Sequence, residues 1–152
     1  MRMKKWGQWI FPGLAVLILD RIVKIATEGV AWRAVPGVIA IRSVHNSGMA
    51  MGMMQGKSAA ILLLSLALIG ACVWLLIGMK PRGLAVIAVS MIAGGALGNM
   101  IDRVCLGYVL DMFDVEFMDF YVFNVADAGV VIGAALCAVS LLFRPQEWRK
   151  QA

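Results

Sequence analysis

The sequence predicts an all-α membrane protein with four transmembrane helices, a small extracytoplasmic β-sheet cradle and an interfacial aromatic loop or helix. The first observation is composition: of the 152 residues, 62% are hydrophobic and only 15% are charged. One water-facing domain of this size cannot bury so much apolar surface, whereas a bilayer accommodates it. The other two observations are long apolar stretches and the uneven distribution of lysine and arginine along the chain.

Four stretches are long and apolar enough to cross a bilayer, which takes about 20 helical residues. Two carry no charge, one has only Asp127 near its start, and the first is apolar until Asp20, Arg21 and Lys24 near its end. The first stretch begins like a signal peptide but has no small-residue cleavage site, so we expect it to be retained. We therefore predict one domain, residues 1–152, with transmembrane helices at about 6–26, 59–79, 83–101 and 125–143.

Basic residues predict the orientation, because lysine and arginine gather in cytoplasmic loops of membrane proteins. Four crossings place eight of them on one side: Arg2, Lys4, Lys5, Lys80, Arg82, Arg144, Arg149 and Lys150. The other side holds only Arg33, Arg42, Lys57 and Arg103. We therefore expect both termini in the cytoplasm. The net charge of +5 is then a topology signal, and without a basic stripe interleaved with aromatic residues we expect no nucleic-acid partner.

Two connecting segments, about 28–58 and 102–124, should lie on the extracytoplasmic side. The first contains VIAIRSV, residues 38–44, whose β-branched residues predict a strand, followed by turn formers. The second is aromatic, and its Phe113, Phe117 and Phe120 have helical spacing. Aromatic side chains gather at membrane–water interfaces, so this segment is either an interfacial belt or a gate over a site.

Polar residues recur toward the extracytoplasmic ends of these elements, where they can meet in one layer. They are Asp20 and Lys24, four residues apart; Asn46; Asn99 and Arg103, four apart; Asp111; and Asn124 and Asp127, three apart. Ionisable groups inside a membrane usually face the bundle interior and mark a functional site.

The sequence leaves a structural interpretation of each cluster open. The first pair could be an ion pair on one helix face. The cluster that ends the third predicted helix could cap that helix or reach the headgroups. Asn124 could N-cap the last helix by accepting a hydrogen bond from the backbone amide of Asp127.

Two aspartates in such a layer suit hydrolysis. The chain has no His, Cys and Glu set with zinc spacing and no serine placed with a histidine base, so we expect neither a metal nor another cofactor. Two carboxylates a few ångströms apart share one proton: the charged one can deprotonate a water, and the protonated one can polarise a peptide carbonyl. Composition and spacing make aspartyl proteolysis possible without establishing it.

Four motifs, in order along nearly the whole chain, resemble bacterial lipoprotein signal peptidase (signal peptidase II). They are Asp20-xxx-Lys24; NSGMAMG, residues 46–52; GGALGNMIDRVCLGYVLD, residues 94–111; and FNVAD, residues 123–127. The resemblance implies an inner-membrane aspartyl protease, expected to be a monomer, whose active site faces the periplasm. Its partners would be membrane lipid and a prolipoprotein, cleaved just before a cysteine that carries a diacylglyceryl group.

The resemblance also implies roles for individual residues. The catalytic pair would be Asp111 and Asp127, braced by Asp20 and Lys24. The supporting and substrate-binding shell would be Asn46, Gly48, Asn99, Arg103 and Asn124.

The sequence departs from the family pattern at two methionines: Met51 stands where an aromatic residue is expected, and Met112 where phenylalanine is usual. Asp114 could be mistaken for the partner of Asp127. We prefer Asp111 because it closes the Gly-x-Val-x-Asp frame.

Two other functions remain compatible with these residues. A small proton-coupled transporter or channel would place its carboxylate near the bilayer midplane, whereas here the acids cluster at one end. A membrane assembly factor would use the polar residues as ion pairs and Gly94-xxx-Gly98 as a helix-packing face.

Overall fold

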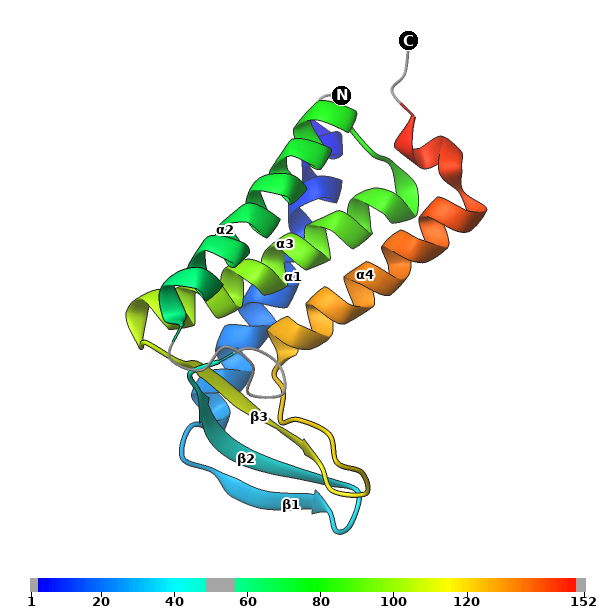
Figure 1. The fold of residues 1–152 in the computed structure, drawn as a ribbon. Coiled ribbons are helices and arrows are strands. Elements are labelled where there is room, and N and C mark those ends of the chain that lie inside the picture. The colour runs from blue at the N-terminus through cyan, green and yellow to red at the C-terminus, as the bar shows by residue number, and fades with distance from the viewer. Residues whose placement is uncertain (1–2, 49–56, 150–152) are drawn as a thin grey trace.

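The structure is a computed structural model that describes residues 3–48 and 57–149. Four long helices run side by side, and a three-stranded sheet lies at one end of the helical bundle (Figure 1). The start of α1, Met3–Thr27, lies at the opposite end of the bundle, as does the short 3₁₀ helix η3, Pro145–Trp148.

The remaining helices are α2, Ser58–Trp74, which continues as the π-helical turn η2, Leu75–Met79; α3, Gly83–Cys105; and α4, Val125–Phe143. Among the described residues, three stretches are long and apolar enough to cross a membrane: Ser58–Met79, Gly83–Cys105 and Val125–Phe143. α1 covers the first predicted span but is not one of these three. The prediction of four spans is therefore not confirmed.

α3 is the central helix, because α1, α2 and α4 all pack against it. Of its membrane-length window 56% is buried, compared with 11% for Ser58–Met79 and 22% for α4. The outward faces of α2 and α4 expose large apolar side chains, among them Leu63, Leu64, Leu66, Leu141, Leu142 and Phe143. Lipid accommodates such faces and water does not, as expected for a multi-pass membrane protein.

α1 and α3 approach closely beside Pro12, which lacks a backbone N–H. The next amide, that of Gly13, donates to the hydroxyl of Ser90 (3.0 Å), and this hydroxyl donates to the carbonyl of Trp9. A side chain of α3 is thus inserted into the hydrogen-bond ladder of α1. A Cβ atom on Gly94 would collide with the backbone of Gly13, so glycine is required for this approach.

The antiparallel sheet has the order β1–β2–β3, with β1 at Ala31–Val35, β2 at Ile39–Asn46 and β3 at Val109–Val115. The first two strands confirm the small sheet predicted for the first connecting segment. The helical interpretation of Phe113, Phe117 and Phe120 is wrong. Phe113 lies in β3, opposite Ile41 of β2, while the other two lie in and after the turn that follows.

At the end of the bundle away from the sheet, Glu147 of η3 holds the start of α3. Its carboxylate accepts from the backbone amide of Ala85 (3.0 Å) and from the Ser140 hydroxyl (3.0 Å), and its carbonyl accepts from the amide of Arg82 (3.1 Å). The first amides of a helix lack partners within it and attract negative charge. Burial acts to raise the pKa of Glu147, but these hydrogen bonds and the charge of Arg144 lower it below its usual value.

We expect Glu147→Ala to lower the free energy of unfolding by about 1–2 kcal/mol, because the Ala85 amide and the Ser140 hydroxyl each lose a hydrogen bond to a charged carboxylate. Since its pKa is lowered in the folded state, this contribution is present above pH 4.5 and is lost as the pH falls through the lower folded value. Thermal unfolding in one detergent at several pH values measures both effects. The exposed neighbour is the control: Gln146→Ala should stay within about 0.5 kcal/mol of wild type, and equal losses in the two variants would contradict the capping role.

Candidate active site

The two residues of the predicted catalytic pair, Asp111 and Asp127, are called the dyad below. They lie on different elements that meet where the sheet joins the helical bundle. Asp111 is the third residue of β3, and Asp127 is the third residue of α4. Asp111 is only 2% exposed, and Asp127 is partly buried. All four carboxylate oxygens of the pair accept hydrogen bonds from asparagine residues.

Asn124 contacts both carboxylates. Its Nδ2 donates to Asp111 Oδ1 (2.6 Å), and its backbone amide donates to Asp127 Oδ2 (3.3 Å). Its own Oδ1 accepts from the backbone amide of Asp127 (2.8 Å), which completes a capping box at the start of α4. The same side chain therefore caps a helix and joins the two halves of the candidate site.

Asn99 and Asn46 hold the outer oxygens. Asn99, near the end of α3, donates through Nδ2 to Asp127 Oδ1 (2.7 Å) and accepts through Oδ1 from Asn124 (3.0 Å). Asn46, at the end of β2, donates through Nδ2 to Asp111 Oδ2 (2.9 Å). The asparagines come from β2, α3 and the start of α4, so the site forms only when these elements are assembled.

Arg103 ties the end of β2 to α3. Its Nη2 donates to the carbonyl of Gly48 (2.9 Å) and its Nη1 to the carbonyl of Asn99 (3.4 Å), while the Gly48 amide donates to Asn46 Oδ1 (2.9 Å). Arg103 and Gly48 thereby hold the end of β2 next to Asn46, which itself contacts Asp111. Met51, one of the two departures from the family pattern, lies outside the described residues.

Asp20 and Lys24 belong to a buried ionic cluster next to the dyad. Lys24 Nζ lies 2.9 Å from Asp20 Oδ2, 2.7 Å from Asp102 Oδ2 and 3.3 Å from Asn99 Oδ1. Arg21 contacts both carboxylates as well, at 2.7 Å from Asp20 Oδ2 and 2.5 Å from Asp102 Oδ1. We did not predict roles for Arg21 and Asp102. The available signal was a charged residue at membrane depth that needs a partner.

The pKa of Asp111 is raised from 3.8 to about 6. Burial is the main cause and the negative charge of Asp127 adds to it, while hydrogen bonds from Asn46 and Asn124 and the charge of Lys24 act in the opposite direction. A carboxyl group that titrates near neutral pH can both hold and release a proton under working conditions.

Other candidate groups lie elsewhere. Asp114, the alternative partner for Asp127, pairs with Arg42 at 2.5 Å. His45, the single histidine, stacks on Tyr108 with ring centroids 4.1 Å apart. In the described ranges, no group of three or more His, Cys, Asp or Glu side chains is arranged to hold a metal ion.

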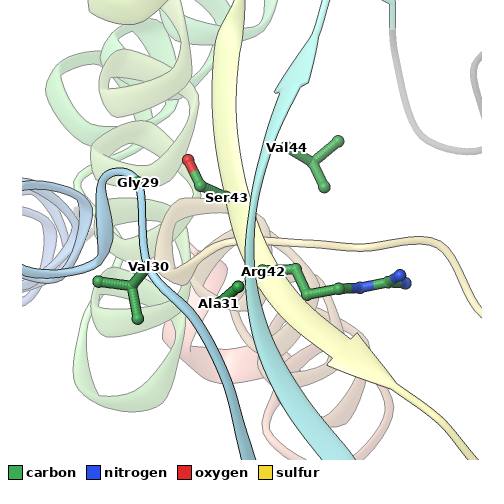
Figure 2. A pocket seen from close by; sticks show the side chains of 6 residues that line it. All are labelled: Gly29, Val30, Ala31, Arg42, Ser43 and Val44. Carbon is green, nitrogen blue, oxygen red and sulfur yellow. The ribbon is translucent and has the colours of Figure 1, made fainter.

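A cavity of about 490 Å³ lies beside β2 and is lined by Gly29, Val30, Ala31, Arg42, Ser43 and Val44 (Figure 2). Ser43 points toward the turn after α1, whereas Arg42 and Val44 point the opposite way. No predicted site residue lines this cavity, and it gathers no carboxylates. The buried aspartate pair is therefore the better candidate for chemistry.

Residues 13–143 match the family model described as signal peptidase (SPase) II. The matched range covers most of the chain and includes every residue of the candidate site. This chain belongs to the signal peptidase II family. Membership of this family implies that the protein is a peptidase, and hence a hydrolase.

Curated relatives and a solved structure agree with this assignment. The lipoprotein signal peptidase of Lactiplantibacillus plantarum is 31% identical over 88% of this chain and 95% of its own length. That of Streptococcus thermophilus is 36% identical over 84% of this chain and 88% of its own length. A bacterial membrane enzyme structure, obtained by the in meso method at 2.3 Å resolution, is 31% identical and superimposes with a TM-score of 0.84 over 96% of this chain and 94% of that one. The recognition of signal peptidase II from the sequence motifs is confirmed.

For this signal peptidase II we expect Asp111→Asn to change how stability depends on pH. A carboxyl whose pKa is raised on folding stabilises the fold below its unfolded value of 3.8, and that stabilisation is lost as the pH rises through about 6. Asparagine does not titrate, so the stability of the variant relative to wild type should rise with pH by up to about 3 kcal/mol.

Thermal or denaturant unfolding in detergent between pH 4 and 8 measures this difference. The comparison at pH 4, where Asp111 is still protonated in the folded protein, approximates the cost of replacing the carboxyl by an amide and is subtracted from the others. Parallel curves for the two proteins across this range would show that Asp111 ionises without hindrance in the folded state.

Proposed function

We propose that this protein is a membrane aspartyl endopeptidase that removes the signal peptide from diacylglyceryl-modified prolipoproteins by cleaving just before the lipidated cysteine. The observation that carries the proposal is the buried pair Asp111 and Asp127, brought from β3 and α4 and joined through Asn124. The names of the relatives, lipoprotein signal peptidases, support the substrate class. No observation on the described residues favours the transporter or the assembly factor.

The mechanism follows from two carboxylates that share one proton. The charged carboxylate removes a proton from a water, which attacks the carbonyl carbon of the scissile peptide bond. The protonated carboxyl polarises the carbonyl oxygen and then donates its proton to the leaving amine. The raised pKa of Asp111, about 6, supports this exchange, because the carboxyl can keep a proton closer to neutral pH than an ordinary aspartate and can still release it.

The surrounding residues orient the dyad and the substrate. Asn46, Asn99 and Asn124 donate hydrogen bonds to the carboxylate oxygens. These neutral donors fix the orientation of both carboxylates without cancelling their charge. Arg103 holds the Gly48 carbonyl, and through it the chain that would lie against the peptide backbone of the substrate. The ionic cluster with Asp20 and Lys24 braces this arrangement from α1.

The proposed placement in the membrane has four spans, including α1. α1 has 25 residues, enough to cross about 30 Å of hydrocarbon, and its charged residues are compensated within the bundle. The start of α1 and η3 both lie at the end of the bundle opposite the sheet (Figure 1). That end carries the lysine and arginine residues that we expect in the cytoplasm. The dyad then faces the outer leaflet, where a lipid-anchored substrate can reach it. We propose that the enzyme acts as a monomer.

We expect Asp111→Asn and Asp127→Asn each to reduce cleavage by about 10²–10⁴-fold or more, because either change removes one half of the acid–base pair. Purified variants in detergent, given a diacylglyceryl-modified prolipoprotein, measure the rate of appearance of the shortened product. The matched control is Asp114→Asn, which removes a carboxylate paired with Arg42 and should retain activity. Processing at the wild-type rate by either dyad variant would contradict the aspartyl mechanism.

The proposed orientation predicts which thiols a membrane-impermeant maleimide reaches. Cys105, exposed at the end of α3 nearest the sheet, should be labelled in intact spheroplasts, and Cys105→Ser should lose that label. In the Cys105→Ser background, Gln146→Cys should react only after the membrane is permeabilised, because η3 lies at the opposite end. The reverse pattern would invert the proposed topology.

A further inference from the structure

Two buried carboxylates hold the backbone immediately before each dyad residue. Asp20 Oδ1 accepts from the amide of Ala126 (3.0 Å), the residue before Asp127. Asp102 Oδ2 accepts from the amide of Leu110 (3.4 Å), one residue before Asp111. Asp20 is fully buried and Asp102 is 1% exposed, so neither contact competes with water.

These two carboxylates are clamped together by Arg21. Its Nη1 donates to Asp102 Oδ1 (2.5 Å) and its Nη2 to Asp20 Oδ2 (2.7 Å), with a further bond from Nη2 to the Gly98 carbonyl (3.2 Å). The guanidinium is a rigid planar fork, so donating to one acceptor with each arm fixes their separation. Lys24 also touches both, but its ammonium is a point charge on a flexible stem and sets no such spacing.

We propose that Arg21 is a positioning residue of the dyad: it fixes the separation of Asp20 and Asp102 and, through the amides they hold, the separation of Asp127 and Asp111. The inference rests on the proposed function, because it takes the dyad as the catalytic pair. Arg21 itself contacts neither dyad carboxylate nor the asparagines that hold them. Its influence on hydrolysis is therefore indirect, unlike that of Lys24, which reaches Asn99.

Arg21 also balances charge next to the dyad. Asp20, Asp102, Arg21 and Lys24 together carry no net charge, and loss of Arg21 leaves the cluster with one uncompensated negative charge. The ionisable groups that interact electrostatically with the dyad lie on α1, on α3 and in the segment before α4. They are Asp20 and Lys24, Arg103, and Tyr121. An added negative charge opposes ionisation of a nearby carboxyl, so the pH at which the dyad becomes active should rise.

Arg21 is suited to a direct test because its replacement need not unfold the protein. Its side chain is 31% exposed, and its buried Nε has no hydrogen-bond partner among the described residues. Glutamine at this position can still donate to one carboxylate while losing the charge and the two-armed fork. Lysine keeps the charge and loses the fork.

The experiment measures kcat and KM for the lipid-modified prolipoprotein from pH 5 to 9 with wild type, Arg21→Gln, Arg21→Lys and Arg33→Gln. Arg21→Gln should lower kcat by about 10-fold or more, with KM within about two-fold, because the misplacement acts on the reacting groups. The acidic limb of its pH profile should move up by about 0.5–1 pH unit. Arg21→Lys should restore the position of the acidic limb but only part of kcat.

The control is Arg33→Gln. It also removes one positive charge, that of a β1 residue whose exposed side chain pairs with Glu116, and it should match wild type in kcat and pH profile. An acidic limb that stays in place in Arg21→Gln overturns the inference whether or not kcat falls, and so does an unchanged kcat. Failure of the proposed function is distinct: wild type then cleaves nothing, or Asp111→Asn and Asp127→Asn cleave as wild type does.

Discussion

The structure depends on the partners of its buried aspartates, whose carboxylate oxygens are satisfied in two ways. Asp20 and Asp102 are paired with cations, which compensates their charge and makes them fixed anchors. The oxygens of Asp111 and Asp127 accept instead from the amides of asparagine residues, and in the described part of the chain neither forms an ion pair. Amide donors satisfy lone pairs without cancelling the charge, so a proton can still move between these two carboxylates. In the proposed mechanism the same residue type therefore serves as an anchor in one place and as a reactant in the other.

Most of the fold followed from apolarity, because a bilayer makes the length of uncharged stretches the dominant signal. The exception among the strands is β3. Its residues, VLDMFDV, do not alternate between apolar and polar, since the strand is buried on nearly its whole length and carries two aspartates with separate partners. A strand of this kind is recognisable only from its neighbour β2, which lies more than 60 residues earlier in the chain. Local periodicity cannot reveal such a pairing.

The candidate site shows a similar division between motif and geometry. The motifs identify Asp111, Asp127 and the asparagines. For Asn124, however, the sequence could not decide between a helix cap and a site residue, because the side chain makes both contacts at once. Arg21 and Asp102 were missed for a different reason. Each stands beside a more prominent charged residue, Asp20 and Arg103, and only the packing of α1 on α3 shows that the less prominent pair meets.

Assembly of the site therefore depends on contacts made far from it, in the first half of α1. Asp20 reaches the Ala126 amide only if α1 lies against α3 and α4 at close range over the preceding turns. Pro12 interrupts the hydrogen bonding of α1, Ser90 repairs that interruption with its hydroxyl, and the missing side chain of Gly94 lets the two backbones touch. Further along, a Cβ on Gly129 of α4 would lie 2.5 Å from Val16, so α4 is held at the same short range. The small residues of the helices and the charges of the ionic cluster are thus parts of one constraint: close helix packing brings α1 near enough for a buried carboxylate to fix the start of α4, and with it Asp127.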